Sequence, residues 1–189
     1  MSDDALPPGS DWQRFGEFLA LLARVEVGRR WQGKIDLSGV VQQTLLEAFQ
    51  AGAPLSGQAE AQKAAWLRQA LTNNLNDEIR KLHTAKRDVR REQALVPRLE
   101  ESFSRLEQLL PAAGSTPSQR VMRAERMLEV ASAVARLPAS QRQVIELHHL
   151  QGQTLAEVAE ALGTTKPAVA GLLHRGLKRL RELLGGTAG

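Results

Sequence analysis

The side chains in this sequence that could do chemistry are mostly cations, and they gather in two runs. The first run lies between Arg80 and Glu92, where six basic residues stand against two acidic ones: Arg80, Lys81, Lys86, Arg87, Arg90 and Arg91 against Asp88 and Glu92. The second run lies near the C-terminus and consists of His174, Arg175, Lys178, Arg179 and Arg181. Such runs bind the phosphates of a nucleic acid, or else form solvated helix faces. The formal net charge of +4 suits a polyanionic partner.

Patterns typical of catalysis or of metal binding are lacking. The sequence contains no cysteine, which excludes disulfides, thiolate catalysis and Cys-ligated zinc, and which fits a cytoplasmic protein. His148 and His149 are adjacent, so we expect their rings to diverge on a helix without other ligands to complete a metal site. No HExxH motif and no phosphate-binding glycine loop occurs. We therefore expect no enzymatic activity, no metal and no cofactor.

The composition favours an all-α fold. Hydrophobic residues make up 42% of the chain, but aromatic residues only 4%, and no run alternates β-branched residues as strands do. Helical patterns are predicted from Ser10 to about Gly33, after Asp36, from Glu60 to Glu92, and from Ser118 to Arg136. A capping box of Ser140 and Gln143 is expected to open the next helix. No apolar run approaches the roughly 18 residues of a membrane span, so no membrane insertion is expected.

The stretch from Thr154 to Leu184 predicts a helix-turn-helix. Thr154 and Glu157 fit a capping box at the start of the first helix, and Gly163 supplies a left-handed turn. Thr165 can cap the second helix, while Val169 can fill the angle between the two helices. The second helix of such a motif enters the major groove of DNA. The alternative is an ordinary helical hairpin with a solvated basic face.

The chain divides into two predicted helical domains, residues 10–95 and 118–184. The segment between them, residues 96–117, contains Pro97, Pro111 and the stretch 112–117, which we interpret as a flexible linker. Each domain carries one of the two basic runs. Two modest binding modules on a tether can span separated sites on one polymer and gain affinity by effective concentration.

Both domains resemble an ECF-type (extracytoplasmic function) sigma factor of the bacterial sigma-70 class. In the C-terminal half the matching stretches are LPASQRQVIELHHLQGQTLAEVAEALGTT and AVAGLLHRGLKRLREL. In the N-terminal half they are DLSGVVQQTLLEAF and AWLRQALTNNLNDEIRKLHTAKRDVRRE. The resemblance implies that residues 10–95 act as sigma domain two, which binds the clamp of core RNA polymerase and opens the promoter −10 element. Residues 118–184 would act as sigma domain four, which reads the −35 element as duplex DNA.

By position, the resemblance implies three groups of binding residues. The group for core polymerase is Asp36, Val41, Gln42, Gln43 and Leu46. The group for −10 DNA is Asn73, Asn74, Asp77, Arg80, Lys81, Arg87, Arg90 and Arg91. The group for −35 DNA is Thr165, Lys166, His174, Arg175 and Lys178. An anti-sigma factor or another regulatory protein is a further partner that the resemblance allows.

Three features qualify these assignments. Many relatives carry Lys-Ser-Arg where this chain has Ala170, Gly171 and Leu172, so the lone C-terminal domain is expected to bind duplex weakly. The alternative to DNA binding for Asn73 and Asn74 is that they are ordinary residues of a helix surface or of a helix cap. Asp77 stands one turn before Lys81 and is expected to pair with it.

Two other function classes compete with the sigma factor. A stand-alone helix-turn-helix regulator predicts a dimer that binds duplex tightly without polymerase, but no dimerising heptad is evident. A nucleic-acid hydrolase needs clustered carboxylates for a metal, and the acidic residues here are scattered.

Overall fold

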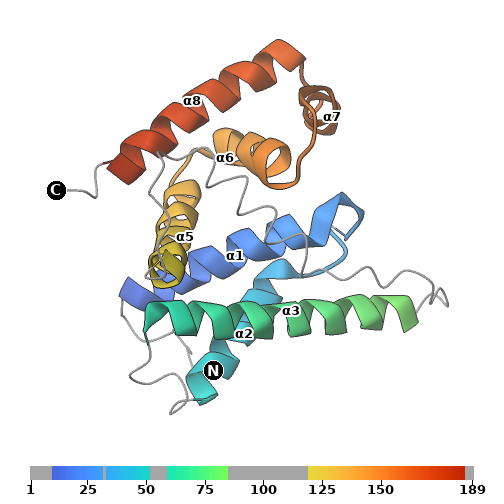
Figure 1. The fold of residues 1–189 in the computed structure, drawn as a ribbon. Helices are drawn as coiled ribbons and strands as arrows, with labels where there is room; N and C mark the ends of the chain where they lie inside the picture. The colour runs from blue at the N-terminus through green and yellow to red at the C-terminus, as the bar shows by residue number, and fades with distance from the viewer. Residues whose placement is uncertain (1–9, 32, 52–58, 85–118, 186–189) are drawn as a thin grey trace, which may run out of the picture.

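The computed structural model describes residues 10–31, 33–51, 59–84 and 119–185, and Figure 1 shows their arrangement. The N-terminal part forms α1 (Ser10–Trp31), α2 (Leu37–Ala51) and α3 (Glu60–Thr84). The C-terminal part forms α5 (Gln119–Ala135), α6 (Ala139–Ile145), the π-helical turn η1 (Glu146–Leu150), α7 (Leu155–Ala161) and α8 (Lys166–Gly185). No strand occurs among these residues, which confirms the all-α prediction. The predicted linker 96–117 lies outside the described residues.

The three N-terminal helices bury leucine-rich stripes against one another. On α1, Phe18, Leu19 and Leu22 are at most 2% exposed, and their spacing places them on one helix face. The corresponding stripe of α3 consists of Leu67, Leu71 and Leu75. The chain can reverse between α1 and α2 because Gly33 takes a φ of 78°, a left-handed conformation that other residues resist.

Helix α5 belongs to the same core although it follows far along the chain. Leu128, Ala131 and Val134 are at most 1% exposed, and α5 contacts both α1 and α3 (Figure 1). Ser132 Oγ donates a hydrogen bond to Glu17 Oε2 of α1. The domain limits 10–95 and 118–184 stay a prediction, but the described residues of the two halves pack directly against each other.

A second core forms between α6, η1, α7 and α8. Its members are Leu137, Val144, Ile145, Leu147, Val158, Ala159, Val169 and Leu173. Gly176 lets α8 approach α6 closely, because a Cβ atom at this position would lie 2.9 Å from Ile145 Cδ1. Leu150 and Leu180 are buried in the first core instead, so the two cores meet at η1 and α8.

The start of α6 corrects one prediction. The helix begins at Ala139, directly after Pro138, and no side chain caps it. The predicted capping box of Ser140 and Gln143 is therefore wrong. The physical reason is that the Pro138 carbonyl already accepts from Arg142 N over 2.9 Å, which starts the helix before Ser140. None of the described helices has the length and apolarity to cross a membrane.

Candidate nucleic-acid interfaces

The helix-turn-helix forms as its local signals predict. Thr154 Oγ1 accepts from Glu157 N over 3.3 Å, and Thr154 N donates to Glu157 Oε2 over 2.7 Å. This reciprocal pair is the predicted capping box, and it fixes the start of α7. Gly163 takes a φ of 61°, which ends the helix in a left-handed turn.

Two residues hold α7 and α8 at their crossing. Ala159 is 6% exposed and Val169 is fully buried, so the small residue allows contact and the branched one fills the angle. Thr165 Oγ1 accepts from Ala168 N over 3.4 Å and so begins α8 as its cap. The Thr165 hydroxyl, which we assigned to −35 DNA, therefore serves the helix itself in this structure.

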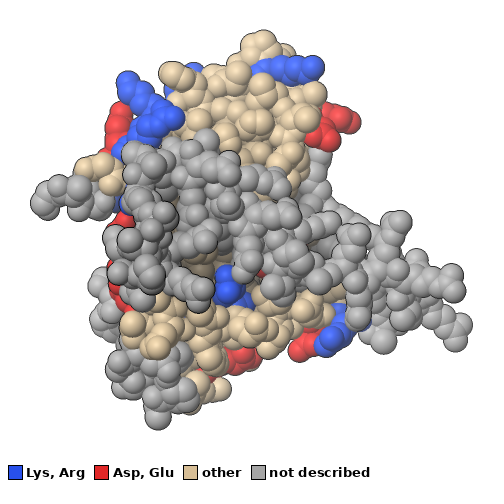
Figure 2. All heavy atoms as spheres, viewed as in Figure 1, with Lys and Arg blue, Asp and Glu red and all other residues tan. Residues whose placement is uncertain are grey.

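The outer face of α8 presents the predicted cations to solvent. Lys166, His174, Arg175 and Lys178 are all exposed, while Leu173 and Leu180 lie on the buried face. Figure 2 shows Lys and Arg side chains gathered near both ends of α8. The structure thus exposes four of the five −35 candidates: His174, Arg175 and Lys178 lie on the side of α8 away from the core, and Lys166 stands at the start of the helix.

Arg175 folds back along α8 toward Gly171. A Cβ atom built at Gly171 would lie 3.4 Å from Arg175 Nη1. A helical side chain leans toward the N-terminus of its own helix, so the guanidinium covers the space that Gly171 leaves open. This contact is not visible in the sequence pattern, where Gly171 counts only as a lost polar residue.

The face of α2 assigned to core polymerase is partly apolar and exposed. Gln42 and Gln43 are exposed, and Leu46 is 42% exposed. Phe49, which our assignment omits, is 55% exposed one turn further along. Asp36 caps α2, since its Oδ1 accepts from Gly39 N over 3.0 Å.

Val41 departs from the rest of this group. Its side chain is only 9% exposed and lies in the first core. In this structure it supports α2 from within and does not reach the surface with Gln42 and Gln43.

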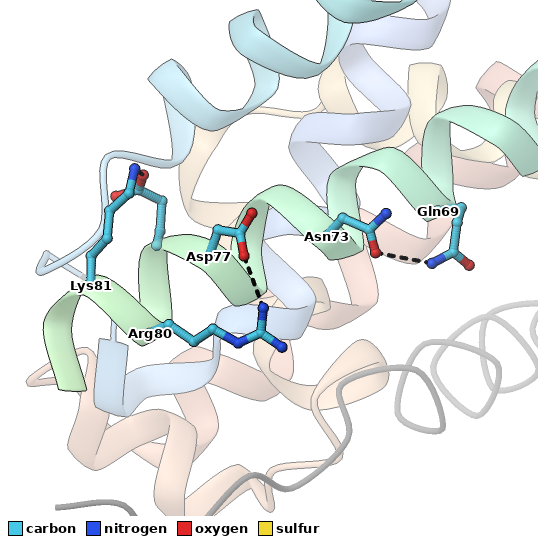
Figure 3. Close-up of polar contacts among 6 residues, drawn as sticks. Gln69, Asn73, Asp77, Arg80 and Lys81 are labelled. Atoms are coloured by element: carbon cyan, nitrogen blue, oxygen red, sulfur yellow. Dashed lines mark hydrogen bonds and ion pairs between the residues drawn. The ribbon is translucent and has the colours of Figure 1, made fainter. Parts of the chain in front are cut away.

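On α3, the candidates for −10 DNA fall into different environments. Asn73 is exposed, and its Oδ1 accepts from Gln69 Nε2 over 3.2 Å (Figure 3). Asn74 is half-buried and donates to Thr44 and Glu47 of α2. Only Asn73 of the two stands on the outer surface of the helix.

At the charged end of α3, acidic side chains pair with basic ones three residues further along the helix. Asp77 Oδ1 accepts from Arg80 Nη1 over 3.0 Å, as Figure 3 shows, and Lys81 Nζ donates to Glu78 Oε1 over 2.7 Å. Lys81 thus has Glu78 as its hydrogen-bond partner, and its expected interaction with Asp77 is present as an attraction between the two charges. The hydrogen bond to Glu78 and the charges of Glu78 and Asp77 raise the pKa of Lys81. The remaining −10 candidates, Arg87, Arg90 and Arg91, lie outside the described residues.

His148 and His149 are adjacent residues of η1, the π-helical turn that precedes α7. The rings of His148 and His149 meet edge-on with centroids 4.8 Å apart, so the expected divergence is wrong. The wider π-helical turn, in which Gln151 N donates to Glu146 O, replaces the regular helix that we assumed. Burial, and then the charge of His148, lowers the pKa of His149 to about 4.

Local sequence patterns do not indicate that two glutamates, Glu26 and Glu146, are buried. Glu26 of α1 is 2% exposed, and neither carboxylate oxygen has a hydrogen-bond partner among the described residues. Burial raises its pKa to about 7 against the opposing charge of Arg68. Glu146 of η1 is 7% exposed, and burial raises its pKa despite the neighbouring Arg24. Both positions become visible only once the helices are packed.

Comparison with known families supports the C-terminal surface. Residues 127–180 match the family model described as Sigma-70, region 4. The matched segment begins within α5 and ends within α8, so it contains α7, the turn and most of α8. The resemblance to the sigma-70 class is confirmed for this segment, which indicates a DNA-binding, sigma-factor-like function. No curated protein matches the sequence.

Proposed function

We propose that the chain is an ECF-type sigma factor that binds core RNA polymerase and directs it to promoters. The observation that carries this proposal is the combination of a region 4-like helix-turn-helix with an exposed apolar pair, Leu46 and Phe49, on α2. Large hydrophobic side chains gathered on a surface helix mark a protein-binding site. The DNA-binding half alone fits many regulators, whereas this second surface calls for a protein partner.

The two proposed DNA-binding surfaces, on α8 and at the end of α3, would recognise different promoter elements. The cations of α8 would meet duplex DNA at the −35 element, where Arg175 can take the O6 and N7 atoms of a guanine. The end of α3 would meet the opened −10 strand, since an unpaired base needs amide donors and its backbone needs cations. All of this is binding, and no covalent step is required of the chain.

Transcription by a reconstituted enzyme tests the proposal. The full chain is mixed with core RNA polymerase and a library of promoter templates, and the start sites are sequenced. We expect specific starts only when both proteins are present. Nanomolar, sequence-specific duplex binding by the lone chain at physiological salt would contradict the proposal and favour a stand-alone regulator.

The α2 surface has its own variant and control. Phe49→Ser is expected to weaken binding to core polymerase by about tenfold or more, because central aromatic side chains dominate interface energies. Gln50→Ser changes an exposed neighbour on the same helix and is expected to bind as the wild type. Equal affinities of the two variants for core polymerase would show that Phe49 does not lie in the interface.

A further inference from the structure

A group of hydrogen-bonded side chains ties α2 to α3. Asn74 Nδ2 of α3 donates to Thr44 Oγ1 and to Glu47 Oε2, each over 3.1 Å. The other oxygen of that carboxylate, Glu47 Oε1, accepts from Gln43 Nε2 over 3.0 Å. Thr44 is fully buried, while Asn74 and Glu47 are half-buried. The bonds between Asn74 and α2 are tertiary contacts, because they span 30 and 27 positions in the sequence.

The hydrogen-bonding chemistry of Thr44 and Glu47 determines the orientation of the oxygen and nitrogen atoms of the Asn74 amide. The Thr44 hydroxyl donates its hydrogen to Val40 O over 2.8 Å, so its oxygen accepts from Asn74. A carboxylate such as Glu47 can only accept. Thr44 and Glu47 therefore both accept from the NH₂ group of Asn74, and together they occupy both of its hydrogens. Asn74 is left with its carbonyl oxygen for any other donor.

Asn73 shows that this arrangement is specific to one of the two amides. Its hydrogen bond comes from Gln69, four residues earlier on the same helix. Nothing in that local pair depends on α2. Of these two asparagines, Asn74 is the one whose side chain links α3 to the helix that carries Gln43, Leu46 and Phe49.

We propose that Glu47 is a positioning residue that couples the polymerase-binding face of α2 to the strand-contacting end of α3. This inference rests on the proposed function. Hydrogen bonds to a carboxylate are stronger than neutral ones, and Glu47 gives one oxygen to each side. A partner that engages Gln43 changes the bonding of Glu47, and Asn74 responds because the same carboxylate holds its amide. Polymerase binding and strand contact are thereby joined through one side chain.

The contact itself is tested first in the free chain. Glu47→Ala and Asn74→Ala are each expected to lower the Tm, and the double variant to lower it by less than the sum, because both remove the same bond. Glu129→Ala changes an exposed carboxylate on α5 and is expected to leave the Tm unchanged. Strictly additive shifts would show that Glu47 and Asn74 do not interact.

The coupling is tested in the holoenzyme. Gln43→Ala, Asn74→Ala and the double variant are compared for open-complex formation on a duplex promoter and on one already opened at −10. With Glu47 present, we expect the two changes to couple by about threefold or more, within the range found for residues that share a network. In a Glu47→Ala background the coupling factor should fall to about one.

The outcomes separate this inference from the proposed function. If the wild-type chain starts transcription with core polymerase but the two changes act independently in the presence of Glu47, the coupling is overturned. If the coupling factor stays the same after Glu47→Ala, another group carries it and Glu47 is not the positioning residue. If the wild-type chain starts no transcription at all, the proposed function fails, and the coupling between two promoter-related surfaces fails with it.

Discussion

Arg24 of α1 and Glu146 of η1 stand 122 positions apart, yet Arg24 Nε donates to Glu146 Oε1 over 3.0 Å. The main-chain oxygen of Arg24 accepts a second bond from Gln151 Nε2, over 3.1 Å. One residue of α1 thus contacts both the first residue of η1 and the residue that directly follows η1. The pair is asymmetric in burial, since the side chain of Arg24 is 33% exposed and that of Glu146 only 10%. The carboxylate therefore depends on the guanidinium more than the reverse.

We predict that Arg24→Ala lowers the free energy of unfolding by about 1–3 kcal/mol, because it leaves a buried carboxylate without its charged partner. Chemical denaturation of the full chain measures the change. Arg14→Ala is the matched control: its partner Glu60 is 31% exposed, and pairs at such surfaces contribute roughly 0–1 kcal/mol. Equal losses for the two variants would mean that burial of Glu146 is unimportant.

The Arg24→Ala loss should also depend on pH. Burial already raises the pKa of Glu146, and the variant removes the charge that opposes this rise. A carboxyl whose pKa is raised by folding binds more protons in the folded state. Its contribution to the free energy of unfolding therefore becomes less favourable as pH increases. The loss is expected to be larger at pH 8 than at pH 4, where the carboxyl is mostly protonated in both states.

Glu26 is expected to make the protein more stable in mild acid than in mild base. Its pKa rises from the ordinary 4.5 to about 7 in the folded state. The folded chain therefore holds a proton that the unfolded chain releases, and stability declines as pH passes from about 4.5 to 7. At about 1.4 kcal/mol per pKa unit, the effect amounts to roughly 3 kcal/mol. Glu26→Gln should raise the Tm at pH 8 and change it little at pH 4. A gain of equal size at both pH values would contradict this prediction.

Local rules predict the helix-turn-helix, because each of its signals acts within a few residues. Thr154 caps its own helix, Gly163 makes its own turn, and Val169 faces the helix just before it. The same rules place the cations of α8 outside. They fail at Ser140, because the preceding Pro138 starts the helix one residue before it.

Contacts between distant helices are beyond such rules. The resemblance assigns Asn74 to DNA, and the structure adds hydrogen bonds from its amide to Thr44 and Glu47, whose proximity depends on how α2 crosses α3. The resemblance groups Val41 with Gln42 and Gln43, yet its apolar side chain lies in the core with Leu45 and Ala48. Glu26 reads as a surface charge until the helices around it are packed. Tertiary packing decides the cases of Asn74 and Glu26, whereas the helical spacing of Val41, Leu45 and Ala48 already indicates a buried position for Val41.

Two glycines of α8 should respond in opposite directions to the same substitution. Gly176→Ala places a Cβ 2.9 Å from Ile145 Cδ1 and 3.3 Å from Gln141 Cβ, so we expect a loss of about 1–3 kcal/mol from overpacking. At Gly171→Ala the nearest atom is the flexible end of Arg175 at 3.4 Å, and the higher helix propensity of alanine should stabilise by up to about 1 kcal/mol. Thermal melting of both variants measures the difference. Shifts of the same sign would show that propensity alone governs these positions.

Arg175 is expected to read a base within the −35 element. On the proposed function, Arg175→Ala should weaken holoenzyme binding by about 1–3 kcal/mol and relax preference at one or two −35 positions. The measurement is binding to a set of promoters that differ at single −35 positions. Arg181→Ala, an exposed cation beyond the matched segment, serves as the control and should leave the preference intact. A loss that is uniform over all −35 sequences would make Arg175 a contact to phosphate or to polymerase.

The basic run after α3 should govern the salt dependence of promoter binding. Arg87, Arg90 and Arg91 follow the helix that carries Asn73, so cations and an amide are expected along one path of the DNA strand. Each phosphate contact contributes about 0.9 to the salt slope on duplex and about 0.7 on single strands. Replacing the three arginines with alanine should therefore flatten the slope by roughly 2–3 and weaken binding evenly across promoters. Asn73→Ala should instead keep the slope, impair strand opening and alter preference within the −10 element. Both variants are compared on a duplex promoter and on one already opened at −10. A wild-type slope for the triple variant on both templates would mean that this run is only a solvated surface.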